Sequence, residues 1–77
     1  MNITILVFGQ LAEITGRQQL TMDGVSDTDA LIGQLNKLYP ALLHSKYIIA
    51  VNKEVVSKNT ALQRNATVAF LPPFSGG

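Results

Sequence analysis

The group in this sequence best suited to chemistry is the carboxylate at the end of the chain, on Gly77. A carboxylate is a poor electrophile, but conversion to an acyl-adenylate gives it a good leaving group. A sulfur donor could then leave a thiocarboxylate, which is a strong nucleophile, whereas an amine would leave an amide. Because Gly76 and Gly77 carry no side chains, an adenylating enzyme could reach the carbonyl carbon. We therefore expect Gly77 to be the reacting residue.

The residues before the two glycines are suited to presenting that carboxylate in a narrow partner site. Two prolines would stiffen the exit of the chain from the last strand, and residues 72–77 can extend by roughly 20 Å. No charged side chain occurs from Asn65 onward. We expect a folded domain over residues 1–71 and a flexible tail over residues 72–77. The residues assigned to tail presentation are Pro72, Pro73, Phe74, Ser75 and Gly76.

The rest of the chain must position this tail, and its pattern predicts an α+β domain. Strands are expected over residues 2–8, 17–22, 47–51, 54–56 and 66–71. A short helix over residues 11–15 should stop at Gly16. This order favours a mixed sheet packed on one main helix.

The main helix has its own start, stripe and stop signals. Ser26 or Asp27 can cap its first N–H groups. A buried stripe is expected from Leu31, Leu35 and Leu38, and Pro40 should end the helix near Leu38.

The strands carry large apolar side chains on both faces, although one helix can cover a single face. The set expected to face the helix is Ile3, Ile5, Val7, Val68 and Phe70. Leu6, Phe8 and Leu71 would then lie on the open face, where loops or a partner must cover them. We interpret these three as a partner interface beside the tail.

Composition excludes several other classes of function. The chain has 77 residues, a net charge of +1 and no cysteine, which indicates one small domain, no nucleic-acid partner and a cytoplasmic location. No apolar run is long enough to span a membrane. His44 is the single histidine and the acidic residues are scattered. We therefore expect the chain to have no catalytic site of its own and to bind no metal and no cofactor.

Three segments resemble one family, the small subunits of molybdopterin synthase. Residues 68–77, VAFLPPFSGG, are similar to the signature ending of that family. Residues 7–16, VFGQLAEITG, match its opening, and Ala50-Val51-Asn52 falls where the family has its Val-Asn turn. Residues 63–66, Gln-Arg-Asn-Ala, depart from the family's acidic turn, which leaves that part of any partner contact open.

The resemblance implies a ubiquitin-like β-grasp fold and a sulfur-carrier role. Gly77 would be adenylated, at the expense of ATP, by a ubiquitin-activating-like adenylyltransferase and then converted to a thiocarboxylate. The tail would enter the large, catalytic subunit, in a heterotetramer, and give sulfur to cyclic pyranopterin monophosphate.

Three alternatives remain at this point. A thiamine-pathway sulfur carrier would share the mechanism, and a ubiquitin-like tag would form amides with lysines. A plain interaction domain with an inert tail would do neither.

Overall fold

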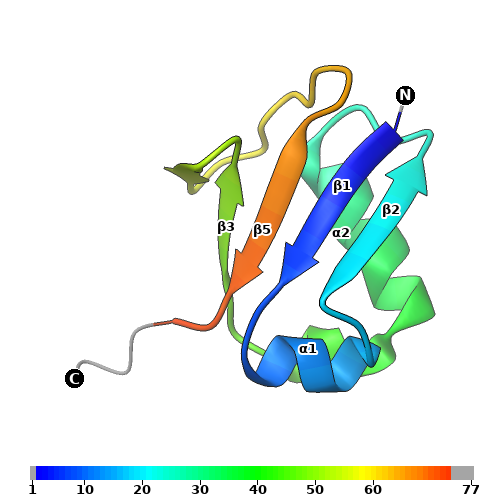
Figure 1. Cartoon of the computed structure of the whole chain (residues 1–77), viewed down its shortest axis with the longest axis vertical. Helices are drawn as coiled ribbons and strands as arrows, with labels where there is room; N and C mark the ends of the chain where they lie inside the picture. The colour runs from blue at the N-terminus through cyan, green and yellow to red at the C-terminus, as the bar shows by residue number, and fades with distance from the viewer. Residues whose placement is uncertain (1, 74–77) are drawn as a thin grey trace.

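The computed structural model describes residues 2–73, which fold into a mixed sheet with helices on one face and at one end (Figure 1). The elements are β1 (Asn2–Val7), α1 (Gln10–Thr15), β2 (Gln19–Asp23), α2 (Thr28–Leu38), the 3-10 helix η1 (Pro40–His44), β3 (Ile48–Val51), β4 (Glu54–Val56) and β5 (Thr67–Leu71). The predicted α+β class, with one main helix on a mixed sheet, is confirmed.

The last strand in the chain lies in the middle of the sheet. The strand order is β2-β1-β5-β3-β4, so β5 separates the β1–β2 hairpin from the β3–β4 hairpin. It runs parallel to β1 and antiparallel to β3. Pro72 and Pro73, which follow β5, therefore leave from the centre of one end of the sheet, not from an edge (Figure 1).

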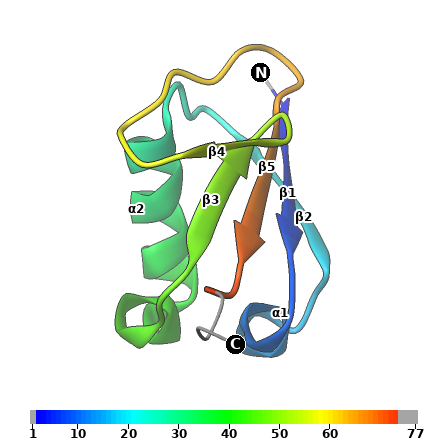
Figure 2. The ribbon, with the colours of Figure 1, turned by 90° about the vertical axis from the view of Figure 1, so that its left-hand side faces the viewer.

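Helix α2 covers one face of the sheet, and no helix or strand of the described chain covers the other (Figures 1 and 2). Its N-cap is Asp27, whose side chain accepts a hydrogen bond from the backbone N–H of Ala30 at 2.8 Å. This resolves the choice that the sequence left between Ser26 and Asp27.

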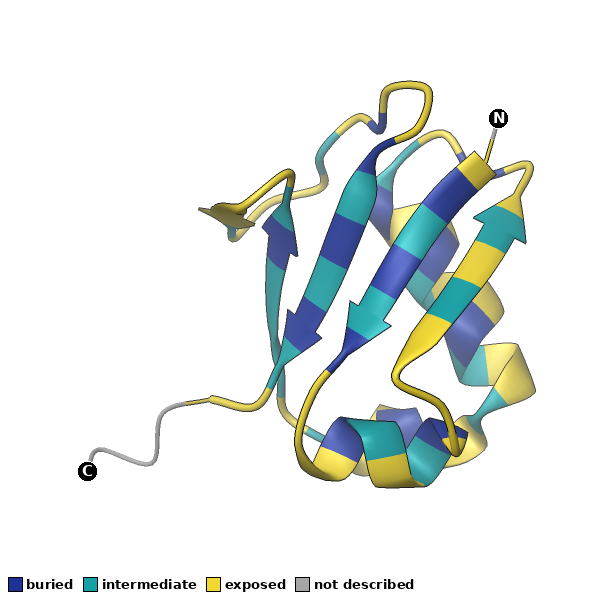
Figure 3. Cartoon of the chain, in the orientation of Figure 1, coloured by how far each residue is buried: buried dark blue, intermediate teal, exposed yellow. Residues whose placement is uncertain are grey.

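The core between α2 and the sheet is built from the predicted inward set. Ile3, Ile5, Val7, Val68 and Phe70 are all buried, in strict alternation with more exposed neighbours along β1 and β5 (Figure 3). Leu31 and Leu35 of α2 complete the layer. The period-2 pattern of the two strands thus identified the buried face correctly.

The expectation that Leu38 is buried is wrong. Leu38 is 63% exposed because it is the last residue of α2, where the chain turns away into η1. The helix η1 was not predicted, and its Leu42 is buried in the core. Helical periodicity identifies a face of a helix, but it does not say how far along the helix the core extends.

Candidate functional site

The tail begins at the end of β5, and the structure describes its first two residues. Pro72 and Pro73 follow Leu71 directly and are both exposed. Phe74, Ser75, Gly76 and Gly77, which the sequence assigns to presentation and reaction, lie outside the described residues. The predicted roles of all six tail residues remain predictions.

The base of the tail is fixed by pairing with the chain that leaves β1. The backbone N–H of Phe8 donates to the carbonyl oxygen of Phe70 at 3.1 Å, one residue beyond the end of β1. The ladder between the two central strands therefore continues to the point where the tail begins. The tail leaves the sheet beside the loop into α1.

Strand register brings small and large apolar side chains together on the open face. Residues paired across a ladder project to the same side of a sheet. Leu6 is paired with Ala69, Ala69 with Ala50, and Ala50 with Val55. Leu71 is paired with Ile48. We call these six residues the apolar strip: Leu6, Ile48, Ala50, Val55, Ala69 and Leu71.

The apolar strip contains no charged residue and crosses four strands. Leu6 and Leu71 are half-buried, Val55 is 69% exposed, and Phe8 beside the strip is 43% exposed. Burying these side chains against a partner would be favourable, by ~25 cal/mol for each Å² of apolar surface removed from water. The three residues predicted for a partner interface thus lie together, and their role in binding stays a prediction.

Sequence reasoning missed Ile48 and Val55 as members of the strip. Alternation along β3 gives two faces but does not say which one points to the helix, because both carry apolar residues. The signal lay in the register of β3 against β5, which a single sequence does not reveal.

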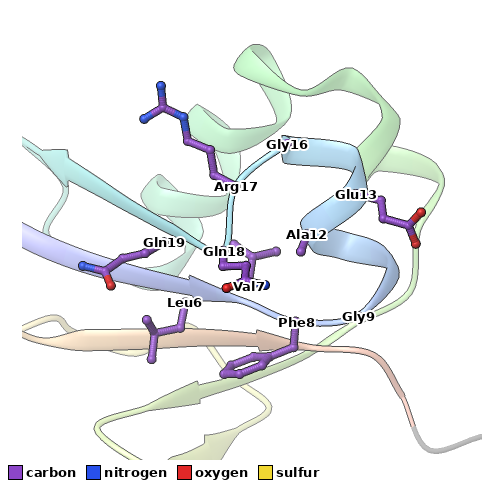
Figure 4. Close-up of a pocket in the computed structure, with 10 residues that line it drawn as sticks. All are labelled: Leu6, Val7, Phe8, Gly9, Ala12, Glu13, Gly16, Arg17, Gln18 and Gln19. Carbon is purple, nitrogen blue, oxygen red and sulfur yellow. The ribbon is translucent and has the colours of Figure 1, made fainter.

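A groove adjoins the strip where β1 runs into α1 (Figure 4). It has a volume of about 950 Å³. Leu6 and Phe8 lie on one side of it, while Glu13 and Arg17 point in different directions from its other end. A partner seated on the strip would meet one acidic and one basic side chain here.

Metal-binding side chains do not cluster in the part of the chain that the structure describes. No three His, Asp or Glu side chains gather there as a group able to hold a metal ion. His44 ends η1 and is exposed. Burial raises the pKa of the Tyr47 phenol, because desolvation disfavours its charged form.

Two further sequence features can be compared with the structure. Asn65, in the turn before β5, adopts a left-handed conformation, with φ of 62°. Within residues 2–73, the structure contains no helix long and apolar enough to cross a membrane.

Comparison with known proteins adds relatives that cover the whole chain. A model of the ThiS family matches residues 5–77. The molybdopterin synthase sulfur carrier subunit of Arabidopsis thaliana is 31% identical, over all of this chain and 84% of that protein.

Solved structures agree with the fold. The crystal structure of SAMP1, a small archaeal modifier protein, from Haloferax volcanii has a TM-score of 0.79 and 26% identity, with both chains fully covered. A protein–protein complex of subunits 1 and 2 of the molybdopterin-converting factor from Helicobacter pylori contains a chain with a TM-score of 0.74 and 24% identity, again with full coverage of both chains. These neighbours identify the sheet and helix as a ubiquitin-like β-grasp.

Proposed function

Since the chain belongs to the ThiS family, we propose that it is the sulfur-carrier subunit of a molybdopterin synthase, with the Gly77 carboxylate as its reacting group. The observation that carries this proposal is the exit of the tail from the central strand, beside an uncharged apolar strip. A partner docked on the strip would receive the tail directly. The relative from Arabidopsis thaliana, which bears the same function in its name, supports the choice of reaction.

The proposed loading of the tail takes two steps in an activating enzyme. An oxygen of the Gly77 carboxylate attacks the α-phosphorus of ATP, and pyrophosphate leaves. A hydrosulfide ion, HS⁻, then attacks the carbonyl carbon of the acyl-adenylate, and AMP leaves. The product is a thiocarboxylate, and the described residues take no part beyond binding and orientation.

The proposed transfer takes place in the large subunit. The thiocarboxylate sulfur passes to cyclic pyranopterin monophosphate, and water restores the carboxylate. A dithiolene needs two sulfur atoms, so two loaded tails are consumed for each product. This chain supplies the reacting atom, while the partner binds the substrate and holds the catalytic side chains.

Mass spectrometry tests the loading step. The intact chain is incubated with ATP, an activating enzyme and a sulfide source, and then weighed. We expect one oxygen of the chain to be replaced by sulfur, with the change confined to the C-terminal peptide. A chain that lacks Gly77 is the control and should remain unloaded. A full-length chain that never gains sulfur would falsify the carrier function.

A second candidate function is a protein modifier, favoured by the likeness to SAMP1. In that case the adenylate would be attacked by a lysine amine, and an amide would form. The same incubation, with a lysine-rich acceptor in place of sulfide, distinguishes the two functions. Conjugates that survive hydroxylamine would indicate an amide bond and a modifier. A thiamine-pathway carrier would load with sulfur but would not transfer it to cyclic pyranopterin monophosphate.

A further inference from the structure

Gly9, between β1 and α1, lies against the first proline of the tail. A Cβ atom added to Gly9 would be 2.7 Å from Cγ of Pro72, which is closer than real Cβ atoms approach other atoms. The proline ring therefore occupies the space that any side chain at position 9 would need. Gly9 also has φ of 59° and ψ of −136°, a conformation that is essentially restricted to glycine.

This contact is held in place from both sides. Phe8, the preceding residue, donates its N–H to the carbonyl of Phe70 at 3.1 Å. The carbonyl of Gly9 accepts from the N–H of Ala12 at 3.1 Å, in the first turn of α1. Gly9 is thus fixed between the end of β5 and a helix, and Pro72 has a ring-restricted φ. The direction of the chain at residues 72 and 73 is set where these two stiff segments meet.

We propose that Gly9 is a positioning residue, whose contact with Pro72 sets the direction in which the tail leaves the apolar strip. The proposal rests on the carrier function proposed above, because it concerns how Gly77 reaches the reacting centre of a partner. Gly9 itself touches no reacting atom. A methyl group at position 9 would displace the Pro72 ring and turn the tail, while the docking surface would stay intact.

The structure offers a control for a methyl group at positive φ. Gly16, at the other end of α1, has φ of 74°, and a Cβ added there meets nothing within 4 Å. Gly16→Ala therefore tests a methyl group at positive φ without a contact to the tail, in an αL conformation that L-residues adopt at lower cost than the conformation of Gly9. Pro72→Ala supplies the second arm, because it removes Cγ but keeps Cβ, which lies 3.8 Å from the added methyl.

The contact is measured first, by NMR of the free chain. Wild type and Gly16→Ala should both give nuclear Overhauser effects between the α-protons of Gly9 and the ring protons of Pro72. Gly9→Ala should lose the corresponding effects while the amide spectrum of the β1–β5 ladder is retained. Absence of these effects in the wild type would overturn the proposal without touching the carrier function.

Kinetics of loading by the activating enzyme test the consequence. For Gly9→Ala, kcat should fall by roughly tenfold or more, since misplacement by ~1 Å can cost ~100-fold in rate. The KM for the carrier should stay within about twofold, because the docking surface is unchanged. Gly16→Ala should keep the wild-type kcat. In a Pro72→Ala background, where kcat is already reduced, Gly9→Ala should lower kcat little further. The two substitutions disrupt the same contact, so their effects should not add.

Several results would contradict this role. If Gly9→Ala lowered kcat equally in the wild-type and Pro72→Ala backgrounds, the substitution would be acting through backbone strain alone. A raised KM with an unchanged kcat would assign Gly9 to docking. If Gly9→Ala fails to fold, an unchanged kcat in Pro72→Ala, at an exposed position, overturns the proposal. A wild-type chain that is never loaded overturns the carrier function, and with it the part of Gly9 in that reaction, even where the NMR contact persists.

Discussion

At the scale of single residues, Tyr47 and Phe70 form an aromatic pair at the edge of the core. Their ring centroids are 5.0 Å apart and the rings are tilted by 52°. The Tyr47 side chain packs against the core cluster, and burial raises the pKa of its phenol above 10.0. The neutral form is therefore favoured by folding, which links the stability of the chain to alkaline pH.

The sign of this linkage gives a prediction. In the unfolded chain the Tyr47 phenol ionises near pH 10, whereas in the folded chain it ionises at a higher pH. The stabilisation is fully present below pH 10 and is lost as pH rises through the folded pKa. Urea unfolding from about pH 8 to about pH 11 should show a fall in the free energy of unfolding that is smaller in Tyr47→Phe. An equal fall of the free energy of unfolding in the two proteins would contradict the prediction.

Single residues also show where sequence reasoning reaches its limit. Leu31 and Leu35 were assigned to the core correctly, because helical spacing places them on one face. Leu38 has the same spacing but is exposed at the end of α2. Leu42 of η1 is buried in the core instead. The contact between Gly9 and Pro72 joins residues far apart in the sequence, and no local pattern predicts it.

At the scale of elements, the start of α2 is held by side chains from two parts of the chain. Asp27 caps the N–H of Ala30, while Oδ1 of Asn59 accepts from the N–H of Asp29 at 2.9 Å. Thr28 is buried, and its hydroxyl oxygen accepts from the N–H of Thr60 at 2.9 Å. The polar segment between β4 and β5 is thereby attached to the helix. Local sequence narrowed the cap to Ser26 or Asp27, whereas the contribution of Asn59 depends on the fold.

Removal of the local cap should have a measurable cost. Asp27→Ala leaves the N–H of Ala30 without its side-chain acceptor, and we expect the free energy of unfolding to fall by about 1 kcal/mol. Ser26→Ala is the matched neighbour, and it should change that free energy by less than ~0.5 kcal/mol. Urea unfolding of both variants measures the difference. A larger loss in Ser26→Ala would mean that Ser26 is the cap in solution.

At the scale of the whole molecule, the two faces of the sheet have different tasks. The helix face contains the core, and the open face carries the apolar strip with Phe8 beside it. Alternation in β1 and β5 divides the side chains into two sets, and the set that contains no polar residue packs against α2. The extent of the strip required the β3 register, which depends on long-range pairing.

The open face gives a prediction about binding. Phe8→Asp places a charge beside the apolar strip, and we expect it to weaken binding to the large subunit by about tenfold or more. Leu43→Asp is the control, because Leu43 is 64% exposed but belongs to η1, which packs against α2. Calorimetry should find little effect of the control on affinity. Leu71→Asp should act like Phe8→Asp. If circular dichroism showed that both of these variants are unfolded, the assignment of the two sheet faces would be wrong.

The central position of β5 also bears on how the chain is synthesised. The segments of both hairpins leave the ribosome before the strand that joins them, because β5 lies further along the chain. The inner edges of β1 and β3 then present unpaired backbone groups, which are prone to pair with other chains. Folding can be completed only after β5 emerges. A nascent chain truncated before β5 would lack both a finished sheet and the strand from which the tail extends.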